Sequence, residues 1–162
     1  MDLVENKRKV REKMKEKLRN TTPNELLIAS NELCKKISLL TEFCEAENLA
    51  FYMPLKTEVD IFPLITAALQ QNKKCFIPKV RPDNSCLMDF YLLSNNEPLE
   101  SQLEPGAFGI LEPKSTLPVL GKQIPSCELT MLVPAVSFDK NKNRLGKGKG
   151  FYDRFLQKYP KD

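Results

Sequence analysis

The stretch ELTMLVPAVSFD, residues 128–139, is followed closely by NRLGKGKGFYD, residues 143–153, and together they indicate the fold class. The first is a near-continuous apolar run, which predicts a strand buried on both faces of a sheet. The second carries half of the six glycines of the chain and leads into FYDRFLQKY, residues 151–159, whose apolar residues recur at helical spacing. A strand, a glycine loop and a helix in this order are typical of α/β proteins, in which ligands bind at the carboxyl ends of strands.

Upstream of this stretch, apolar periodicity and capping signals predict alternating helices and strands. A capping box at Thr22-Pro23-Asn24-Glu25 and a cap at Asp60 mark two helix starts. Five prolines between residues 95 and 128 indicate ordered loops and edge strands. We therefore predict one domain over residues 1–162, an α/β layered, mostly parallel sheet flanked by helices. The expected helices cover residues 2–20, 23–40, 61–72 and 151–159, and the expected strands cover residues 48–53, 74–80, 86–93 and 128–139.

The composition limits the class of protein and the catalytic groups that the chain can use. The chain has 162 residues, 41% of them hydrophobic, and a net charge of +4, all ordinary for a soluble globular protein. Five cysteines without a Cys-x-x-Cys pattern indicate free, mostly buried thiols in a reducing cytosol, and no apolar run is long enough for a membrane span. The absence of histidine excludes Ser-His-Asp and Cys-His catalysis. We expect a cytoplasmic protein that uses carboxylates, lysines, arginines or tyrosines.

The glycine loop has the features of a phosphate site. A helix N-terminus offers unpaired amides to an anion, and glycines let phosphate oxygens approach the backbone. Lys147 and Lys149 lie between the glycines, and Asp153 in the first helical turn can hold Mg²⁺. The spacing fits neither Walker A nor a dinucleotide fingerprint. A surface turn with solvated lysines remains the alternative interpretation.

Two cations near the apolar stripe of the first helix also suggest that the protein binds an anion. Lys7 lies on the stripe formed by Leu3, Val10, Met14 and Leu18, and Arg11 lies at its border. Buried unpaired charge is costly, so both side chains either extend to the surface or reach an anion at the sheet edge.

These pieces together resemble the 5-formyltetrahydrofolate cyclo-ligase family, also called methenyltetrahydrofolate synthetase. NRLGKGKGFYDRFL resembles the family signature Arg-Leu-Gly-x-Gly-x-Gly-Tyr-Tyr-Asp, with Phe151 where tyrosine is usual. Four further segments are similar to family motifs in the same order: KRKVR, MPLKTEVD, FGILEP and LVPAVSFD. The resemblance implies a fold like that of sugar-phosphate isomerases and CoA transferases. The family continues beyond the last helix with further strand and helical structure and a second acidic metal ligand, so we expect this fold to lack those C-terminal elements.

The resemblance also implies an activity and a site. The reaction converts 5-formyltetrahydrofolate and ATP to 5,10-methenyltetrahydrofolate, ADP and phosphate, with Mg²⁺; the substrate supplies its own nucleophile, which suits a histidine-free chain. Lys147, Lys149 and Tyr152 are the implied catalytic residues, and Asp153 is the metal ligand. The implied ATP contacts are Lys7, Arg11, Arg144, Leu145, Gly146, Lys147, Gly148, Lys149, Gly150, Phe151 and Tyr152. The implied folate contacts are Met53, Glu58, Phe108, Lys147, Gly148, Lys149, Gly150 and Phe151.

Other functions stay open at this point. The chain could be a family member that binds nucleotide or folate without turnover. A sugar-phosphate isomerase or CoA transferase would need a catalytic glutamate, for which Glu58 is the one attractive candidate. An RNA-binding role for the basic first helix is disfavoured because acidic residues interrupt it and no aromatic platform is evident. We expect a monomer that acts on a small molecule and binds neither nucleic acid nor membrane.

Overall fold

The central sheet is mixed and mostly parallel. The structure, a computed structural model, describes residues 2–83, 85–121 and 128–158. In these ranges, four strands pair in the order β3-β2-β1-β6. Strand β1 runs parallel to both β2 and β6, whereas β3 is antiparallel to β2. The predicted α/β class is confirmed. The strands are β1 (Asn48–Ala50), β2 (Lys74–Val80), β3 (Met88–Leu92) and β6 (Leu129–Met131).

The helices begin close to their predicted caps. At the start of the second helix, the Thr22 hydroxyl accepts a hydrogen bond from the Glu25 amide at 3.2 Å, and the Glu25 carboxylate accepts one from the Thr22 amide at 2.7 Å. This reciprocal pair confirms the capping box. The Phe62 amide donates to the Asp60 carboxylate at 2.9 Å, but the N-cap of this helix is Ile61, so the predicted cap, Asp60, lies one residue before the observed cap position. The helices are α1 (Leu3–Arg19), α2 (Pro23–Ile37), α3 (Thr41–Cys44), α4 (Phe62–Gln70) and α5 (Phe151–Lys158); the short α3 was not predicted.

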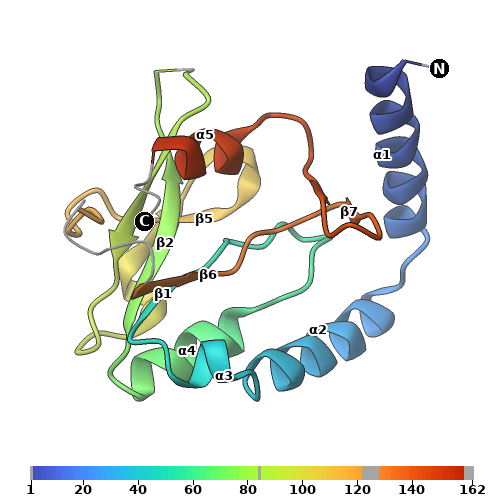
Figure 1. The fold of residues 1–162 in the computed structure, drawn as a ribbon. Helices are drawn as coiled ribbons and strands as arrows, with labels where there is room; N and C mark the ends of the chain where they lie inside the picture. Colours follow the sequence, from blue (N-terminus) through green and yellow to red (C-terminus); the bar gives the residue numbers. More distant parts are fainter. Residues whose placement is uncertain (1, 84, 122–127, 159–162) are drawn as a thin grey trace.

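Alternating strand residues build two apolar layers, one on each face of the sheet. Leu49 and Phe51 point to the face covered by α4, where a core cluster includes Leu64 and Ile65. Ala50 points to the other face, where β2 and β3 residues pack against aromatic side chains of α5. Figure 1 shows α4 and α5 on opposite sides of the strands. The glycine loop therefore leads directly into a helix that packs on the same face of the sheet as Ala50.

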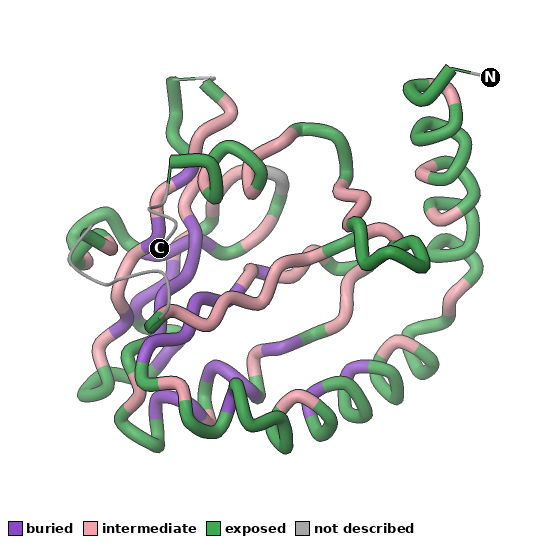
Figure 2. The backbone as a smooth tube through the Cα atoms, in the orientation of Figure 1, coloured by how far each residue is buried: buried purple, intermediate pink, exposed green. Residues whose placement is uncertain are grey.

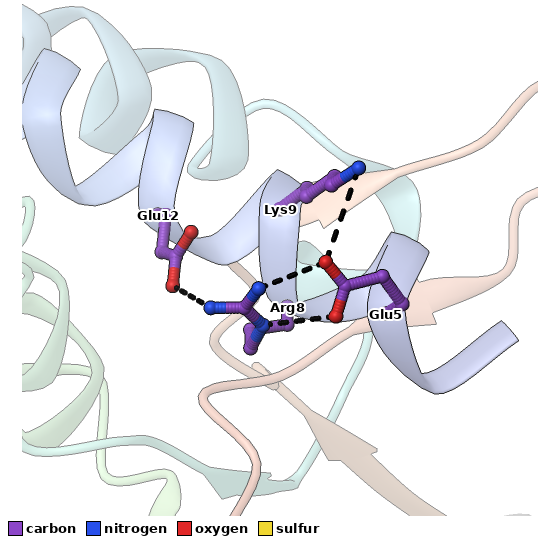
Figure 3. Close-up of polar contacts among 4 residues, drawn as sticks. All are labelled: Glu5, Arg8, Lys9 and Glu12. Atoms are coloured by element: carbon purple, nitrogen blue, oxygen red, sulfur yellow. Dashed lines mark hydrogen bonds and ion pairs between the residues drawn. The ribbon is translucent and has the colours of Figure 1, made fainter. Parts of the chain in front are cut away.

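Helix α1 stands to one side of the sheet (Figure 1), and none of its described residues is buried. The predicted core-facing stripe is therefore wrong: Leu3 is 66% exposed, and Figure 2 shows most of the helix in the exposed class. On its outer surface, Arg8 pairs with Glu5 and Glu12, and Lys9 lies 3.9 Å from Glu5 (Figure 3). Because packing contributes little here, such pairs matter more than usual for the helix.

The predicted buried strand over residues 128–139 is also wrong in extent. Strand β6 covers three residues at an edge of the described sheet, and all three are only half-buried. Pro134 has no amide to continue a ladder. The chain then forms β7 (Ser137–Phe138), which pairs antiparallel with β8 (Arg144–Leu145) in a separate ribbon. An apolar run predicts burial only where other elements cover it, and Phe138 is 64% exposed.

The proline-punctuated segment forms short ordered elements, as predicted. Strands β4 (Leu103–Pro105) and β5 (Leu111–Pro113) pair antiparallel, and the 3₁₀ turns η1 (Leu99–Gln102) and η2 (Ala107–Gly109) adjoin them. Val119 bridges to Tyr91 of β3. Tyr159 and Cys127 lie outside the described residues.

The four cysteines in the described ranges are free: Cys34 and Cys75 are buried, Cys86 is half-buried and Cys44 is exposed. Over the same ranges, the helices are all too short or too polar to traverse a bilayer.

Candidate active site

The glycine loop, residues 146–150, connects β8 to the first turn of α5. Gly148 has φ +104° and Gly150 has φ +69°, backbone conformations that favour glycine. A Cβ at Gly146 would lie 2.8 Å from a nitrogen of the Arg144 guanidinium. The predicted position before a helix N-terminus is confirmed. The preceding strand is the short β8, however, and not a strand of the central sheet.

Three guanidinium groups hold the backbone around the loop. Arg11 of α1 donates to the Gly146 carbonyl at 2.9 Å. Arg144 forms an ion pair with Asp153 and donates to the Pro134 carbonyl at 3.0 Å. Arg154 donates to the Lys149 carbonyl at 2.6 Å. These contacts occupy carbonyl oxygens of the loop and its neighbours, so they limit the electronegative groups available to repel an anion.

A cavity of about 240 Å³ lies beside this loop. The side chains of Arg11, Arg144, Lys147 and Lys149 line it together with the loop backbone and the first residues of α5. Four cations around the N-terminus of a helix create a positive field that suits phosphate groups. The cavity therefore has the charge and the backbone geometry of an anion site.

A second, more apolar cavity of about 290 Å³ adjoins the first. Met53, Pro78, Met88 and Ile110 contribute apolar wall. The two cavities share a wall in which two lysines and two aromatic residues are close together. One end of the combined site suits an anion and the other suits a flat apolar ring. The shared residues are Glu58, Pro134, Lys147, Lys149, Phe151 and Tyr152.

Glu58 and Tyr152 lie at this junction. The Lys147 ammonium is 2.5 Å from Glu58 Oε1, and the Leu55 amide donates to Glu58 Oε2 at 2.9 Å. Burial raises the pKa of the Tyr152 phenol, and the nearby Glu58 charge raises it further. The Tyr152 ring also packs edge-on against Phe90, with centroids 6.4 Å apart. Tyr152 therefore presents a neutral hydroxyl that can donate a hydrogen bond.

Asp153 is the acidic residue beside the anion cavity that could hold a metal. Its carboxylate pairs with Arg144 and remains largely exposed. No group of three or more metal-ligating side chains occurs among the described residues. Mg²⁺ needs no such cage, because it usually takes one or two carboxylates and completes its shell with water and phosphate oxygens. The residues present thus fit a nucleotide with Mg²⁺.

The structure brings together most of the residues predicted for the site. Lys7 and Leu145 are exceptions: Lys7 is exposed on α1, Leu145 is half-buried in β8, and neither lines these two cavities. Met53 is buried in the wall of the apolar cavity. The side chain of Phe108 lies outside the described part of the structure.

Sequence reasoning missed several lining residues. Pro134, Ile110 and Glu112 line a cavity, and Arg154 supports the loop. For Glu112 a signal was available: a lone acid between Leu111 and Pro113 in a largely apolar segment. Pro134 and Ile110 resemble any other apolar residue in the sequence, and only the fold assigns them to the site.

Comparisons with known proteins give a consistent result. Residues 3–162 match the model of the 5-formyltetrahydrofolate cyclo-ligase family. A probable 5-formyltetrahydrofolate cyclo-ligase of Schizosaccharomyces pombe is 37% identical over 80% of this chain, and a 5-formyltetrahydrofolate cyclo-ligase of Haemophilus influenzae is 36% identical over 74% of it. In both cases the match spans 61% of the relative's length. The solved 5,10-methenyltetrahydrofolate synthetase of Aquifex aeolicus superposes with a TM-score of 0.74 at 32% identity, covering 93% of this chain and 72% of that one.

Proposed function

This chain belongs to the 5-formyltetrahydrofolate cyclo-ligase family, and from that premise we propose that it converts 5-formyltetrahydrofolate and ATP to 5,10-methenyltetrahydrofolate, ADP and phosphate. The observation that carries the proposal is the shared wall of the two cavities. Lys147 and Lys149 lie between a cation-rich cavity and an apolar one. A reaction that joins a phosphate to a group on a flat ring needs such a junction.

The anion cavity is assigned to the ATP phosphates. Residues 144–152 supply amides and charge there, and Arg11 adds a guanidinium from α1. Lys7 is assigned to the same nucleotide from the preceding turn of α1. Lys147 and Lys149 neutralise the charge that develops on the transferred phosphoryl group. Asp153 would hold Mg²⁺, which when bound neutralises phosphate charge.

The apolar cavity is assigned to the pterin ring. Met53 and Phe151 provide apolar contact, and Glu58 contacts the substrate at the junction with the nucleotide. Phe108 is assigned an aromatic contact with the same ring. Tyr152 donates a hydrogen bond near the reacting groups. The formyl oxygen is the nucleophile, so the chain needs to supply orientation and charge and no histidine base.

The test is an assay of the purified chain with 5-formyltetrahydrofolate, ATP and Mg²⁺. We expect ATP-dependent growth of the near-ultraviolet absorbance of the methenyl product, and no product when ATP is omitted. Calorimetry on the same preparation measures binding of each ligand separately. Binding of both ligands without turnover would overturn the proposed enzymatic activity and would favour the alternative that the protein only binds them. We further propose that the protein acts as a monomer in the cytoplasm, which sedimentation and cell fractionation can check.

A further inference from the structure

Glu112 of β5 is the only charged side chain among the described residues that is buried, with 4% of its surface exposed. The Val80 amide donates to Glu112 Oε1 at 3.3 Å. Glu112 forms no ion pair with any lysine or arginine in the described ranges. One long amide contact does not offset the loss of water around a carboxylate, so a further donor is expected.

The residues around Glu112 fix the position of its side chain. A Cβ at Gly106 would lie 2.3 Å from the Glu112 Cγ, so the glycine makes room for this side chain. Glu104 lies directly opposite on β4, and it binds the ammonium of Lys79. That ammonium also donates to the Pro113 carbonyl at 2.9 Å. Lys79 is therefore engaged by the neighbouring acid and the backbone, and it forms no ion pair with Glu112.

Glu112 lines the apolar cavity of about 290 Å³, beside Met53, Met88 and Ile110. A buried carboxylate in an apolar wall attracts a ligand that offers N–H donors, because the pair forms out of reach of water. Two parallel donors on a planar edge suit the two oxygens best. Glu58 is less suited to that role, because Lys147 and the Leu55 amide already engage both of its oxygens.

We propose that Glu112 is a substrate-binding residue that recognises the amino group and adjacent ring N–H of the pterin. This inference rests on the proposed function, which makes the pterin the occupant of the apolar cavity. Glu112 then fixes the far edge of the ring, while Glu58 contacts the substrate at the end next to Lys147. The ring is thus held at two ends, and its formyl group is directed toward the lysines at the junction.

The experiment measures binding of 5-formyltetrahydrofolate and of its analogue lacking the 2-amino group. For Glu112→Gln we expect the affinity for the parent compound to fall about tenfold, and for Glu112→Leu about a hundredfold, since hydrogen bonds to charged groups are strong. Wild type should prefer the parent over the analogue by about tenfold or more, and Glu112→Leu should lose this preference. Affinity for ATP should stay within about twofold in both variants, because the lost hydrogen bonds are made to the pterin ring and not to the nucleotide.

Glu104→Gln is the matched control, since it removes the opposite acid, which does not line the cavity; we expect its folate affinity to be unchanged. If Glu112→Leu fails to fold, the similarly sized Glu112→Gln and the wild-type preference between the two compounds decide the matter. Two outcomes would overturn this inference alone. In the first, the wild-type enzyme turns over but Glu112→Gln binds folate as tightly as wild type does. In the second, wild type binds the parent compound and the analogue without the 2-amino group equally well. A wild type that binds no folate would overturn the proposed function as well.

Discussion

The Lys147 ammonium lies 2.5 Å from Glu58 Oε1, which joins the glycine loop to the segment between β1 and α4. Glu58 is mostly buried, with 17% of its side chain exposed, whereas 49% of the Lys147 side chain is exposed. The Leu55 amide also donates to this carboxylate, which is therefore held in place and anchors the half-exposed lysine. The pair thereby positions one lysine of the loop where the two cavities meet.

Because Lys147 is half-exposed, this pair should contribute more to turnover than to stability. In a double-mutant cycle with Lys147→Ala and Glu58→Gln, we expect a coupling energy for unfolding of about 1 kcal/mol or less. For kcat, each single variant should lose about as much as the double variant, because the two residues act as one unit. Urea unfolding and steady-state rates measure the two quantities. Fully additive effects on kcat would contradict the assigned role.

Lys149→Ala should lower turnover strongly while the fold stays intact. Removing one preorganised charge at a developing anion costs about 100- to 1,000-fold in kcat. A lysine in an exposed loop contributes little to folding, so the urea midpoint should move only slightly. The matched control is Lys140→Ala, which removes an exposed lysine of the β7–β8 hairpin outside both cavities. Equal turnover rates for the two variants would show that Lys149 takes no part in catalysis.

Local patterns predicted the elements well where local physics decides the outcome. The Thr22–Glu25 capping box and the short apolar strand β2 depend on near neighbours, and both appear as predicted. The apolar run of residues 128–139 and the stripe of α1 depend on what covers them. Sequence alone gave no measure of that cover, so their burial was overestimated.

The residues of the candidate site were likewise predictable only where local physics determines their role. The glycine loop was predictable because positive φ and close approach to an anion both require glycine, as Gly148 illustrates. The Lys147–Glu58 pair joins residues that are far apart in the sequence, and no local pattern specifies it. Glu112 could be noticed as an isolated acid, but its burial and its cavity depend on the pairing of β4 with β5.

Gly148→Ala should weaken ATP binding through the backbone. With φ at +104°, an alanine forces either strain or a change in the loop, at a cost of about 1–3 kcal/mol. Gly109→Ala is the matched control, because Gly109 has φ +72° and open space around a built Cβ, and it lies outside the anion cavity. Both variants should lose stability in urea, but only Gly148→Ala should bind ATP more weakly by calorimetry. Equal ATP affinities would mean that the loop conformation is not used for the nucleotide.

Asp153→Asn should raise the Mg²⁺ concentration needed for half-maximal rate by about tenfold, since the variant keeps an oxygen ligand but loses the charge. The substitution also breaks the ion pair with Arg144. Asp89→Asn is the control for ion-pair loss, because Asp89 pairs with Arg81 at 2.7 Å away from both cavities. A magnesium titration of the rate separates the two variants. An unchanged Mg²⁺ requirement in Asp153→Asn would assign the residue to loop structure alone.

Alkaline pH should destabilise the fold through buried acids that resist ionisation. Burial raises the pKa of the Cys75 thiol to about 12, and burial also raises the pKa of the Tyr52 and Tyr152 phenols. A raised pKa in the folded state means that the folded chain keeps protons that the unfolded chain releases. The stabilisation is therefore complete below the unfolded pKa values, about 8.5 for cysteine and about 10 for tyrosine, and is lost as pH rises above them.

The free energy of unfolding should thus be level between about pH 7 and 8, and fall above about pH 8.5 by up to about 1.4 kcal/mol per pH unit for each titrating group. Cys75→Ala removes one of the two thiols among the described residues whose pKa is raised by burial, the other being Cys34. We expect the variant to be less stable than wild type at pH 7, because a packed sulfur is lost. Its stability should fall less steeply between pH 8.5 and 10, as measured by urea unfolding at each pH. A slope equal to that of wild type would mean that Cys75 ionises as readily in the folded chain as in the unfolded one, and that its burial is transient.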